Sequence, residues 1–186
     1  MRIHSGHFKG RDIPPPPGTQ TRPTTDVVKE SIFSVIEHTA TFSSAVVLDI
    51  FAGSGQLSWE ALSRGARSAT LIDASAAVCR HLRSVAVNLG VSDVVTIIRT
   101  DALAYVRHGA LHPPSIVFID PPYQLRCCNM IVSALVARDI LPAGALVVVE
   151  HGDQEALLPQ PGYRSAWHRE RSATVVDILV RESTEP

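Results

Sequence analysis

Short apolar runs alternate with amphipathic stretches along this chain from residue 45 onward. The runs are rich in Val, Ile and Leu and contain few polar positions, which is typical of strands buried on both faces of a parallel sheet. Strands of this kind that alternate with helices indicate a doubly wound α/β sheet. We expect strands at residues 45–50, 68–73, 94–99, 116–119 and 145–150, and a final antiparallel pair at 162–168 and 173–180.

The stretches between these runs carry apolar residues at helical spacing. In the stretch 75–89, for example, Leu82, Val85 and Leu89 share one face of a helix, and Gly90 then ends it. An earlier apolar stripe follows two threonines that can cap a helix. We expect helices from about residue 24, at 56–64, at 75–89, from residue 101 and at 127–138.

The strand at 116–119 ends in an unusual way. Asp120 is followed by Pro121 and Pro122, and two consecutive prolines cannot continue the hydrogen-bond ladder of a sheet. In open α/β sheets, ligands bind at the carboxyl ends of the strands. We therefore expect Asp120 and Tyr123 at the rim of a cleft.

This segment has the groups needed to hold an exocyclic amine of a nucleobase. The Asp120 carboxylate and the Pro121 carbonyl can accept both amine hydrogens, which favours the electron-rich nitrogen of an attacking state. Tyr123 offers a flat face on which a base can stack, worth about 1–3 kcal/mol. The alternative is a turn in which Asp120 caps a helix and Tyr123 packs against its neighbours.

The turn after the first strand predicts a nucleotide-like ligand. Gly53 and Gly55 allow the backbone to approach a ligand closely, and Asp73 follows Gly53 by 20 residues, where a ribose diol would lie. Asp101 places a further acid after the third strand. Together these residues predict a cofactor that contains a nucleoside and lies across the strand ends.

NAD and S-adenosyl-L-methionine could both use this arrangement. The dinucleotide motif requires a third Gly or Ala where this chain has Ser58, and the fourth strand delivers Asp120 instead of a second nucleotide-binding half. S-adenosyl-L-methionine fits better, since its methyl group could face the amine held by Asp120. The protein would then supply orientation and electrostatics, because the cofactor carries the reactive group.

Composition limits the remaining possibilities. A chain of 186 residues with 45% hydrophobic and 19% charged residues is expected to form an ordered domain. No apolar run approaches the roughly 18–20 residues of a membrane span. The three cysteines and eight histidines lack metal-ligand spacing, so we expect neither a disulfide framework nor a metal site. These features predict a cytoplasmic protein, and we expect a monomer.

The first 25 residues are basic, whereas the rest of the chain is acidic. They carry a net charge of +3, which leaves −4 for residues 26–186 out of a total of −1. We predict a small hairpin with GHFKG at its tip, in which His7, Lys9 and Arg11 contact RNA phosphates and Phe8 stacks a base. A solvated, flexible tail is the alternative.

Several motifs closely resemble those of one enzyme family. FAGSG at 51–55, LID at 71–73, TDA at 100–102 and IDPPY at 119–123 are similar to the motifs of class I methyltransferases that act on exocyclic amines. GHFKGR at 6–11, TRPTTDVVKESIF at 21–33 and VVVEH at 147–151 further resemble the RsmD-type family. Members of that family are bacterial 16S ribosomal RNA guanine-N2 methyltransferases.

The resemblance implies a Rossmann-like methyltransferase fold with a seven-stranded, mostly parallel sheet, helices on both faces and a hairpin extension at residues 1–25 before a methyltransferase domain at 26–186. It also implies S-adenosyl-L-methionine as cofactor and 16S rRNA as substrate, within an assembled or nearly assembled small ribosomal subunit. The residues that it assigns to the target guanine are Asp120, Pro121, Pro122 and Tyr123. Those assigned to the cofactor are Asp49, Phe51, Gly53, Ser54, Gly55, Asp73, Ala74, Asp101, Ala102, Arg22 and Thr24, and Arg22 is also assigned to RNA.

The C-terminal segment departs from the family pattern, because TVVDILV at 174–180 lacks an aromatic ending. Arg164, Trp167, Arg169 and Arg171 precede it and predict either a basic, aromatic RNA contact or a simple exposed hairpin. We expect Glu60 on a helix surface and His151 either packed or solvated. Cys127 and Cys128 are expected to fill space in the structure rather than to act as nucleophiles.

Three functions from different classes remain open on the sequence alone. The first is methyl transfer to guanine N2 in RNA, with the target base splayed out. The second is methyl transfer to adenine N6 in DNA, although 186 residues leave little room for a separate sequence-reading domain. The third is a cofactor-binding RNA module without catalysis.

Overall fold

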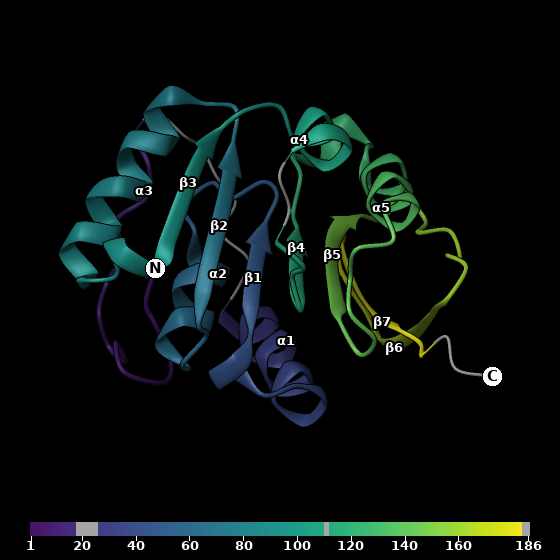
Figure 1. Cartoon of the computed structure of the whole chain (residues 1–186), viewed down its shortest axis with the longest axis horizontal. Coiled ribbons are helices and arrows are strands. Elements are labelled where there is room, and N and C mark those ends of the chain that lie inside the picture. The colour runs from purple at the N-terminus through teal and green to yellow at the C-terminus, as the bar shows by residue number, and fades with distance from the viewer. Residues whose placement is uncertain (18–25, 110–111, 184–186) are drawn as a thin grey trace.

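The computed structural model describes residues 1–17, 26–109 and 112–183. The expectations for Arg22 and Thr24 lie outside these described residues. Within them, the chain folds around one sheet with helices packed on both sides (Figure 1).

The sheet has seven strands in the order β3-β2-β1-β4-β5-β7-β6. The strands from β3 to β5 in this order run parallel to one another. β7 pairs antiparallel with both β5 and β6, so the last hairpin places the final strand inside the sheet and β6 at its edge. The expected α/β fold is confirmed. The strands are β1 (Val46–Asp49), β2 (Ser68–Asp73), β3 (Val95–Arg99), β4 (Ile116–Ile119), β5 (Leu146–Gly152), β6 (Tyr163–Arg171) and β7 (Thr174–Arg181).

The helices divide between the two faces of the sheet (Figure 1). Alternate residues of a strand point to opposite faces, so the sheet supplies two apolar cores. Val47, Leu71 and Phe118 belong to the core shared with α1, α2 and α3, whereas Leu48 and Val117 belong to the core shared with α4 and α5. The helices are α1 (Asp26–Thr39), α2 (Gln56–Ser63), α3 (Ala76–Leu89), α4 (Ala102–His108) and α5 (Cys128–Ala137).

The N-terminal residues form a narrow hairpin that lies along α2. Arg2 and Asp12 bridge its two arms in antiparallel fashion, and the Ile3 amide donates a hydrogen bond to the Arg11 carbonyl. Phe8 is only 8% exposed and belongs to the core of the α1–α3 side. The expectation that Phe8 stacks an RNA base is therefore wrong, because its ring helps to anchor the hairpin to the domain.

Glu60 is the main polar anchor of this hairpin. Its side chain is 0% exposed and accepts hydrogen bonds from the backbone amides of His4 and Ser5, at 2.8 and 3.0 Å. Lys29 of α1, 2% exposed, lies with its Nζ 3.6 Å from Glu60 Oε2 and donates to the Arg2 carbonyl. The expectation of a surface position for Glu60 is wrong, since α1, α2 and the hairpin enclose it.

Candidate active site at the carboxyl ends of the parallel strands

Acidic side chains gather at the carboxyl edge of the sheet. Asp49 ends β1, Asp73 ends β2 and Glu150 lies near the end of β5, while Asp120 directly follows β4. Each lies two residues after a strand residue of the α1–α3 core, so the pleat directs all four carboxylates to the same face. The rim therefore gathers carboxyl groups on one face, which suits a cationic or amine-bearing ligand.

The turn that follows β1 leaves room above this edge. Gly53 has a φ of +52°, and a Cβ at this position would meet nothing nearer than the Phe51 carbonyl oxygen, at 3.8 Å. Asp73 Oδ2 accepts a hydrogen bond from the Gly53 amide at 3.1 Å, which couples the turn to the end of β2. Gly53 and Asp73 thus lie together where the cradle is expected, and their contact with a ligand stays a prediction.

Gly55 has a different reason to be glycine. Its φ is +74°, and a Cβ would lie 2.4 Å from Nε1 of Trp59, whose ring closes the first turn of α2. That indole donates a hydrogen bond to the Ser54 carbonyl at 2.9 Å. Glycine at position 55 is therefore required by the packing of Trp59, and its close approach to a ligand stays a prediction.

Asp49 is a buried acid under this turn. It is 3% exposed, and Oδ2 accepts a hydrogen bond from the Ser58 hydroxyl at 2.7 Å. Burial raises the pKa of Asp49 to about 7, helped by the nearby charge of Asp73 and opposed by the Ser58 hydrogen bond. A cation bound beside Asp49 would favour its ionised form.

Asp120 stands at the rim between two other acids. Burial, followed by the charges of Glu150 and Asp49, raises the pKa of Asp120 well above its usual value. A carboxylate held in this way is a stronger proton acceptor than one in water, which is a feature of catalytic sites. Pro121 is buried and Pro122 is exposed, so the segment passes from the sheet to the surface within two residues.

Tyr123 is fixed by its hydroxyl rather than left free at the rim. The hydroxyl donates to Glu150 Oε1 at 3.0 Å and lies 2.9 Å from the Thr174 hydroxyl. The ring lies close to Gly152, where a Cβ would be 3.4 Å from the Tyr123 Cβ, Cγ and Cδ2 atoms. Partial burial and the Glu150 carboxylate raise the pKa of Tyr123, which keeps the phenol neutral.

Glu150 is the site residue that sequence reasoning missed. It is 6% exposed, contacts Tyr123 and raises the pKa of Asp120. A signal was available, because Glu150 ends an otherwise apolar run in the same way as Asp49 and Asp73 do. An acid at the end of a parallel strand belongs to the ligand edge of the sheet.

The remaining candidates for the cofactor surround this edge less tightly. Ser54 and Phe51 lie half-buried in the turn after β1, and Ala74 is exposed after β2. Asp101 is exposed and caps α4, accepting the Ala104 amide at 2.9 Å, and Ala102 is buried behind it. Their positions at the strand ends are as expected, and their contacts with a cofactor stay predictions.

The predicted RNA-contacting residues of the hairpin lie elsewhere. The His7 amide donates to the carbonyl of Ser63, which is the last residue of α2, whereas Gly55 and the candidate site lie at the first turn of that helix. At about 1.5 Å per residue, the eight residues of α2 span roughly 12 Å. His7, Lys9 and Arg11 are exposed, but the structure does not bring them to the acidic edge.

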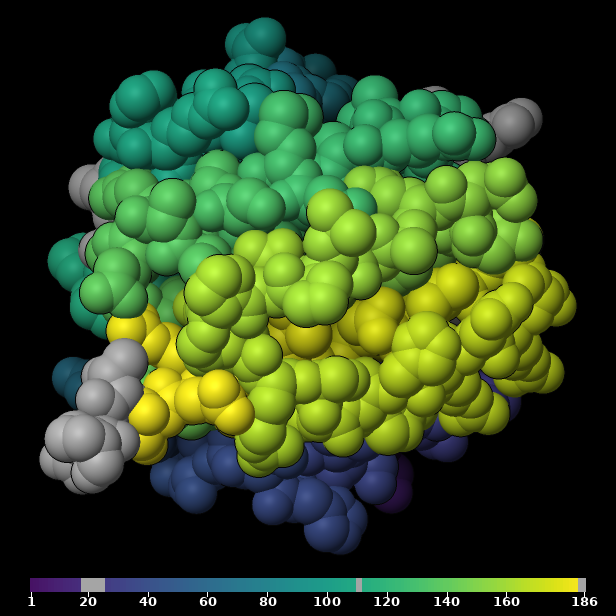
Figure 2. All heavy atoms as spheres, turned by 90° about the vertical axis from the view of Figure 1, so that its right-hand side faces the viewer, coloured from purple at the N-terminus to yellow at the C-terminus, as the bar shows by residue number. Residues whose placement is uncertain are grey.

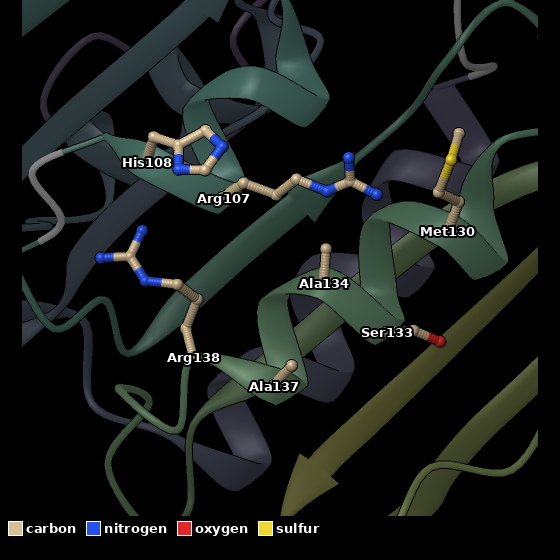
Figure 3. A pocket seen from close by; sticks show the side chains of 7 residues that line it. All are labelled: Arg107, His108, Met130, Ser133, Ala134, Ala137 and Arg138. Atoms are coloured by element: carbon tan, nitrogen blue, oxygen red, sulfur yellow. The ribbon is translucent and has the colours of Figure 1, made fainter.

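A separate groove lies on the opposite face of the sheet, between α4 and α5, and has a volume of about 540 Å³. In Figure 3, Arg107 extends from α4 along one side of it toward Met130, and Arg138 closes the far end. Arg138 donates to the carbonyls of Val106 and Gly109, which ties the two helices together. None of the expected site residues lines this groove, so we assign the candidate site to the acidic edge.

The structure also places the two cysteines after β4 and the histidine that follows Glu150. Cys127 and Cys128 are buried, and burial raises the pKa of both thiols, so they are structural as expected. His151 is packed, with Nε2 2.9 Å from Asp177 Oδ2. Burial alone would lower the pKa of His151, but its hydrogen bonds to Asp177 and the Gly152 carbonyl raise it.

An open sheet of this strand order, with a glycine turn after β1 and acids along its carboxyl edge, defines a class I methyltransferase. The family model described as Conserved hypothetical protein 95 matches residues 1–180. The Ribosomal RNA small subunit methyltransferase D of Escherichia coli (strain K12) is 34% identical over 173 residues, which cover 93% of this chain and 85% of that protein. The chain thus belongs to the RsmD-type methyltransferase family, as its motifs predict.

Solved structures show the same fold. The Escherichia coli protein yhhF superposes with a TM-score of 0.87 at 30% sequence identity, covering 99% of both chains. An RNA methyltransferase from Salinibacter ruber, solved in complex with S-adenosyl-L-homocysteine, gives a TM-score of 0.62 at 16% identity, covering 88% of this chain and 96% of that one. Among the residues that the structure describes, no helix is long and apolar enough to span a membrane.

Proposed function

We propose that this protein transfers a methyl group from S-adenosyl-L-methionine to the exocyclic N2 of a guanine in 16S ribosomal RNA, within an assembled or nearly assembled small ribosomal subunit. The observation that carries the proposal is the position of Asp120 at the carboxyl edge of the sheet, beside the turn at Gly53 and next to a fixed aromatic ring. Family membership supports the same reaction class and an rRNA substrate. Because small subunits are built in the cytoplasm, we place the reaction there.

The residues at the edge fit the cofactor. The open space above Gly53 can take a ligand, and Asp73 lies beside it to accept hydrogen bonds from a ribose diol. The buried carboxylate of Asp49 suits the cationic methionine part. When bound, S-adenosyl-L-methionine supplies an electrophilic methyl group attached to a positively charged sulfur.

The protein's own part is to hold and orient the guanine. The Asp120 carboxylate and the Pro121 carbonyl accept the two N2 hydrogens, which makes the nitrogen lone pair available in the direction of the donor. Tyr123 stacks on the base, and its hydrogen bonds to Glu150 and Thr174 fix the plane of the ring before the base arrives.

Methyl transfer to guanine N2 would be a single nucleophilic displacement, in which the positive charge passes from sulfur to nitrogen. A bound donor would supply its methyl group to the N2 lone pair that Asp120 and Pro121 orient, and would keep the electron pair of the S–CH₃ bond. The methylated nitrogen then carries a positive charge and loses one proton. Asp120 is placed to take that proton, because burial and the charges of its neighbours raise its pKa.

A comparison of methyl acceptors tests this function. Purified protein and radiolabelled S-adenosyl-L-methionine are offered small subunits from cells that lack the modification, free 16S RNA, or duplex DNA. We expect label in the small subunits at a rate at least about tenfold above that for free RNA, since splaying out and positioning one base depends on its assembled surroundings. Label in DNA alone would replace the proposal with adenine-N6 methylation, and label in no acceptor would favour a module that only binds.

A further inference from the structure

The acidic edge creates a problem for any RNA substrate. Asp49, Asp73, Asp120 and Glu150 lie at the strand ends where the target base would enter, and carboxyl groups offer phosphates no favourable charge. RNA affinity depends mainly on cations that neutralise phosphates. The cations of the N-terminal hairpin lie at the far end of α2, so a basic surface closer to the base is needed.

The edge strand β6 provides a basic row that leads to the candidate site. Arg171 pairs with Thr174 of β7, and the Thr174 hydroxyl lies 2.9 Å from that of Tyr123. From Arg171 the row continues along β6, with side chains on one face about 6.6 Å apart at the usual strand rise of about 3.3 Å per residue. Its four members are Arg171, Arg169, Trp167 and Arg164, which we call the β6 row.

A register shift keeps these four residues on one face. They pair with Thr174, Val176, Ile178 and Val180 of β7, which alternate regularly, although Arg164 and Trp167 are three residues apart in the sequence. The shift lies between Ser165 and Trp167, where one extra residue is inserted in β6. Without this bulge, Arg164 would point to the other face.

Within β6 itself, arginines occupy one face and Glu170 the other, while β7 adds both Asp177 and Arg181 to the face of Glu170. Glu170 and Asp177 belong to the opposite face, since Glu170 pairs with Val175 and Asp177 pairs with His168. On the face of the β6 row, Arg169 donates to the Ser31 hydroxyl of α1 at 2.5 Å, and the Trp167 ring packs against the core. Figure 2 shows this end of the molecule, with β6 in yellow-green beside α1 in blue.

The side chains of Arg164 and Arg171 are available to bind a ligand. Both are exposed, and within the described residues neither side chain makes a hydrogen bond or an ion pair. Arginines are suited to phosphate oxygens, because the guanidinium presents several donors in a planar fork. Two uncommitted arginines that flank a fixed arginine and a tryptophan form a surface that fits an RNA backbone.

We propose that the β6 row binds the phosphates of the single-stranded rRNA that flanks the target guanine, and so holds the RNA while the base enters the acidic edge. This inference rests on the proposed function and specifies which surface of the enzyme meets the substrate. Arg171 contacts the phosphates nearest the target base, and Arg164 contacts those farther along the strand. Trp167 and Arg169 form the floor between them.

The test removes the two free charges and leaves the catalytic edge intact. Arg164→Gln/Arg171→Gln is compared with Arg67→Gln/Arg107→Gln, which also removes two exposed arginines but from the turn just before β2 and from α4. Filter binding of small subunits that lack the modification is measured at several salt concentrations. We expect the β6 variant to bind at least about tenfold more weakly, and its log–log salt slope to fall by about 1–1.5, because each lost phosphate contact on a single strand lowers the slope by about 0.7.

Further measurements separate a phosphate contact from a structural effect. Cofactor binding and thermal unfolding should not change in the β6 variant, and Arg164→Lys/Arg171→Lys should recover most of the affinity. Equal affinity and salt slope in the β6 variant and the control would overturn the inference. So would loss of affinity in the control alone.

The binding assay also keeps this inference distinct from the proposed function. Suppose that wild-type protein binds small subunits through the β6 row but transfers no methyl group. This result would contradict the proposed function and would still support the β6 row as an RNA-binding surface. Wild-type protein that methylates small subunits, with kinetics that the β6 substitutions do not change, would contradict the surface alone.

Discussion

The hydroxyl of Tyr123 donates a hydrogen bond to Glu150 Oε1 at 3.0 Å, across the ends of two neighbouring parallel strands. The same carboxylate raises the pKa of Asp120, which lies three residues before Tyr123. One buried acid therefore both orients the ring that would stack the base and tunes the group that would hold its amine. This arrangement explains why β5 carries an acid at its end in an otherwise apolar strand.

We predict that Tyr123→Phe lowers kcat about tenfold and leaves cofactor affinity unchanged. The ring remains, but it loses the hydrogen bonds that fix its plane, and a bond to a charged group is worth roughly 1.5 kcal/mol or more. Rates of methyl transfer under saturating cofactor measure the effect. Tyr163→Phe, at the far end of β6, is the matched control and should change kcat less than about twofold. Equal rates for wild type and Tyr123→Phe would show that the hydroxyl does not position the base.

Asp120→Ala is expected to reduce kcat at least about 100-fold, because it removes one of the two acceptors that hold N2 and also the proton acceptor. It should not reduce stability, since it relieves a desolvated carboxylate that is crowded by Glu150 and Asp49. Denaturant unfolding and methyl transfer on the same preparation test both parts. An active Asp120→Ala enzyme would exclude the assigned role.

Cofactor binding should depend on pH through Asp49. The pKa of this carboxyl is raised from 3.8 to about 7, so burial of its ionised form costs the folded state stability as the pH rises from 3.8 through about 7. A cationic ligand beside it favours the ionised form, and its affinity should therefore rise with pH by up to about tenfold per unit until the pH reaches about 7.

Calorimetric titration with S-adenosyl-L-methionine between about pH 5.5 and 7 measures this dependence. Asp49→Asn should bind more weakly and lose most of the pH dependence. Asp120→Asn should retain it, which separates the two groups with raised pKa values. A pH profile that is unchanged in Asp49→Asn would show that another group is responsible.

The buried pair of Lys29 and Glu60 should be important for stability rather than for catalysis. We predict that Glu60→Gln lowers the free energy of unfolding by about 3–5 kcal/mol, because it removes the buried negative charge that pairs with both Lys29 and Arg64. Lys29→Met/Glu60→Gln should be less destabilised than the single variant. Urea unfolding measures both, with Asp139→Asn as the control, since it removes an exposed carboxylate from a salt bridge to Arg181 that shares no partner with Glu60.

The core elements could be predicted from the sequence because their signals are local. β2 was expected at 68–73 and is observed as Ser68–Asp73, since a run of apolar residues between turn signals has one simple solution. Asp73 and Asp120 were likewise identified from their position after buried runs, whereas Glu150, which occupies a similar position near the end of β5, was missed. In contrast, the length of β6 was underestimated, because its edge position makes its outer residues polar.

Glu60 and Phe8 could not be placed from local patterns, since their environments depend on contacts between segments about 55 residues apart. A partial signal existed for Glu60. Its helix carries apolar or small residues on nearly all sides, and Leu57 to Ser63 are all buried. A helix of that kind is enclosed by the protein, which argues against an exposed acid.

The central claim is that the edge beside Asp120 methylates the N2 of guanine in small-subunit RNA. Nucleoside analysis by mass spectrometry, after reaction of the enzyme with small subunits that lack the modification, tests it most directly. The account predicts one new N2-methylguanosine per subunit with wild-type enzyme and none with Asp120→Ala. A methyl group found on adenine or cytosine, or an equal yield of N2-methylguanosine with Asp120→Ala, would contradict it.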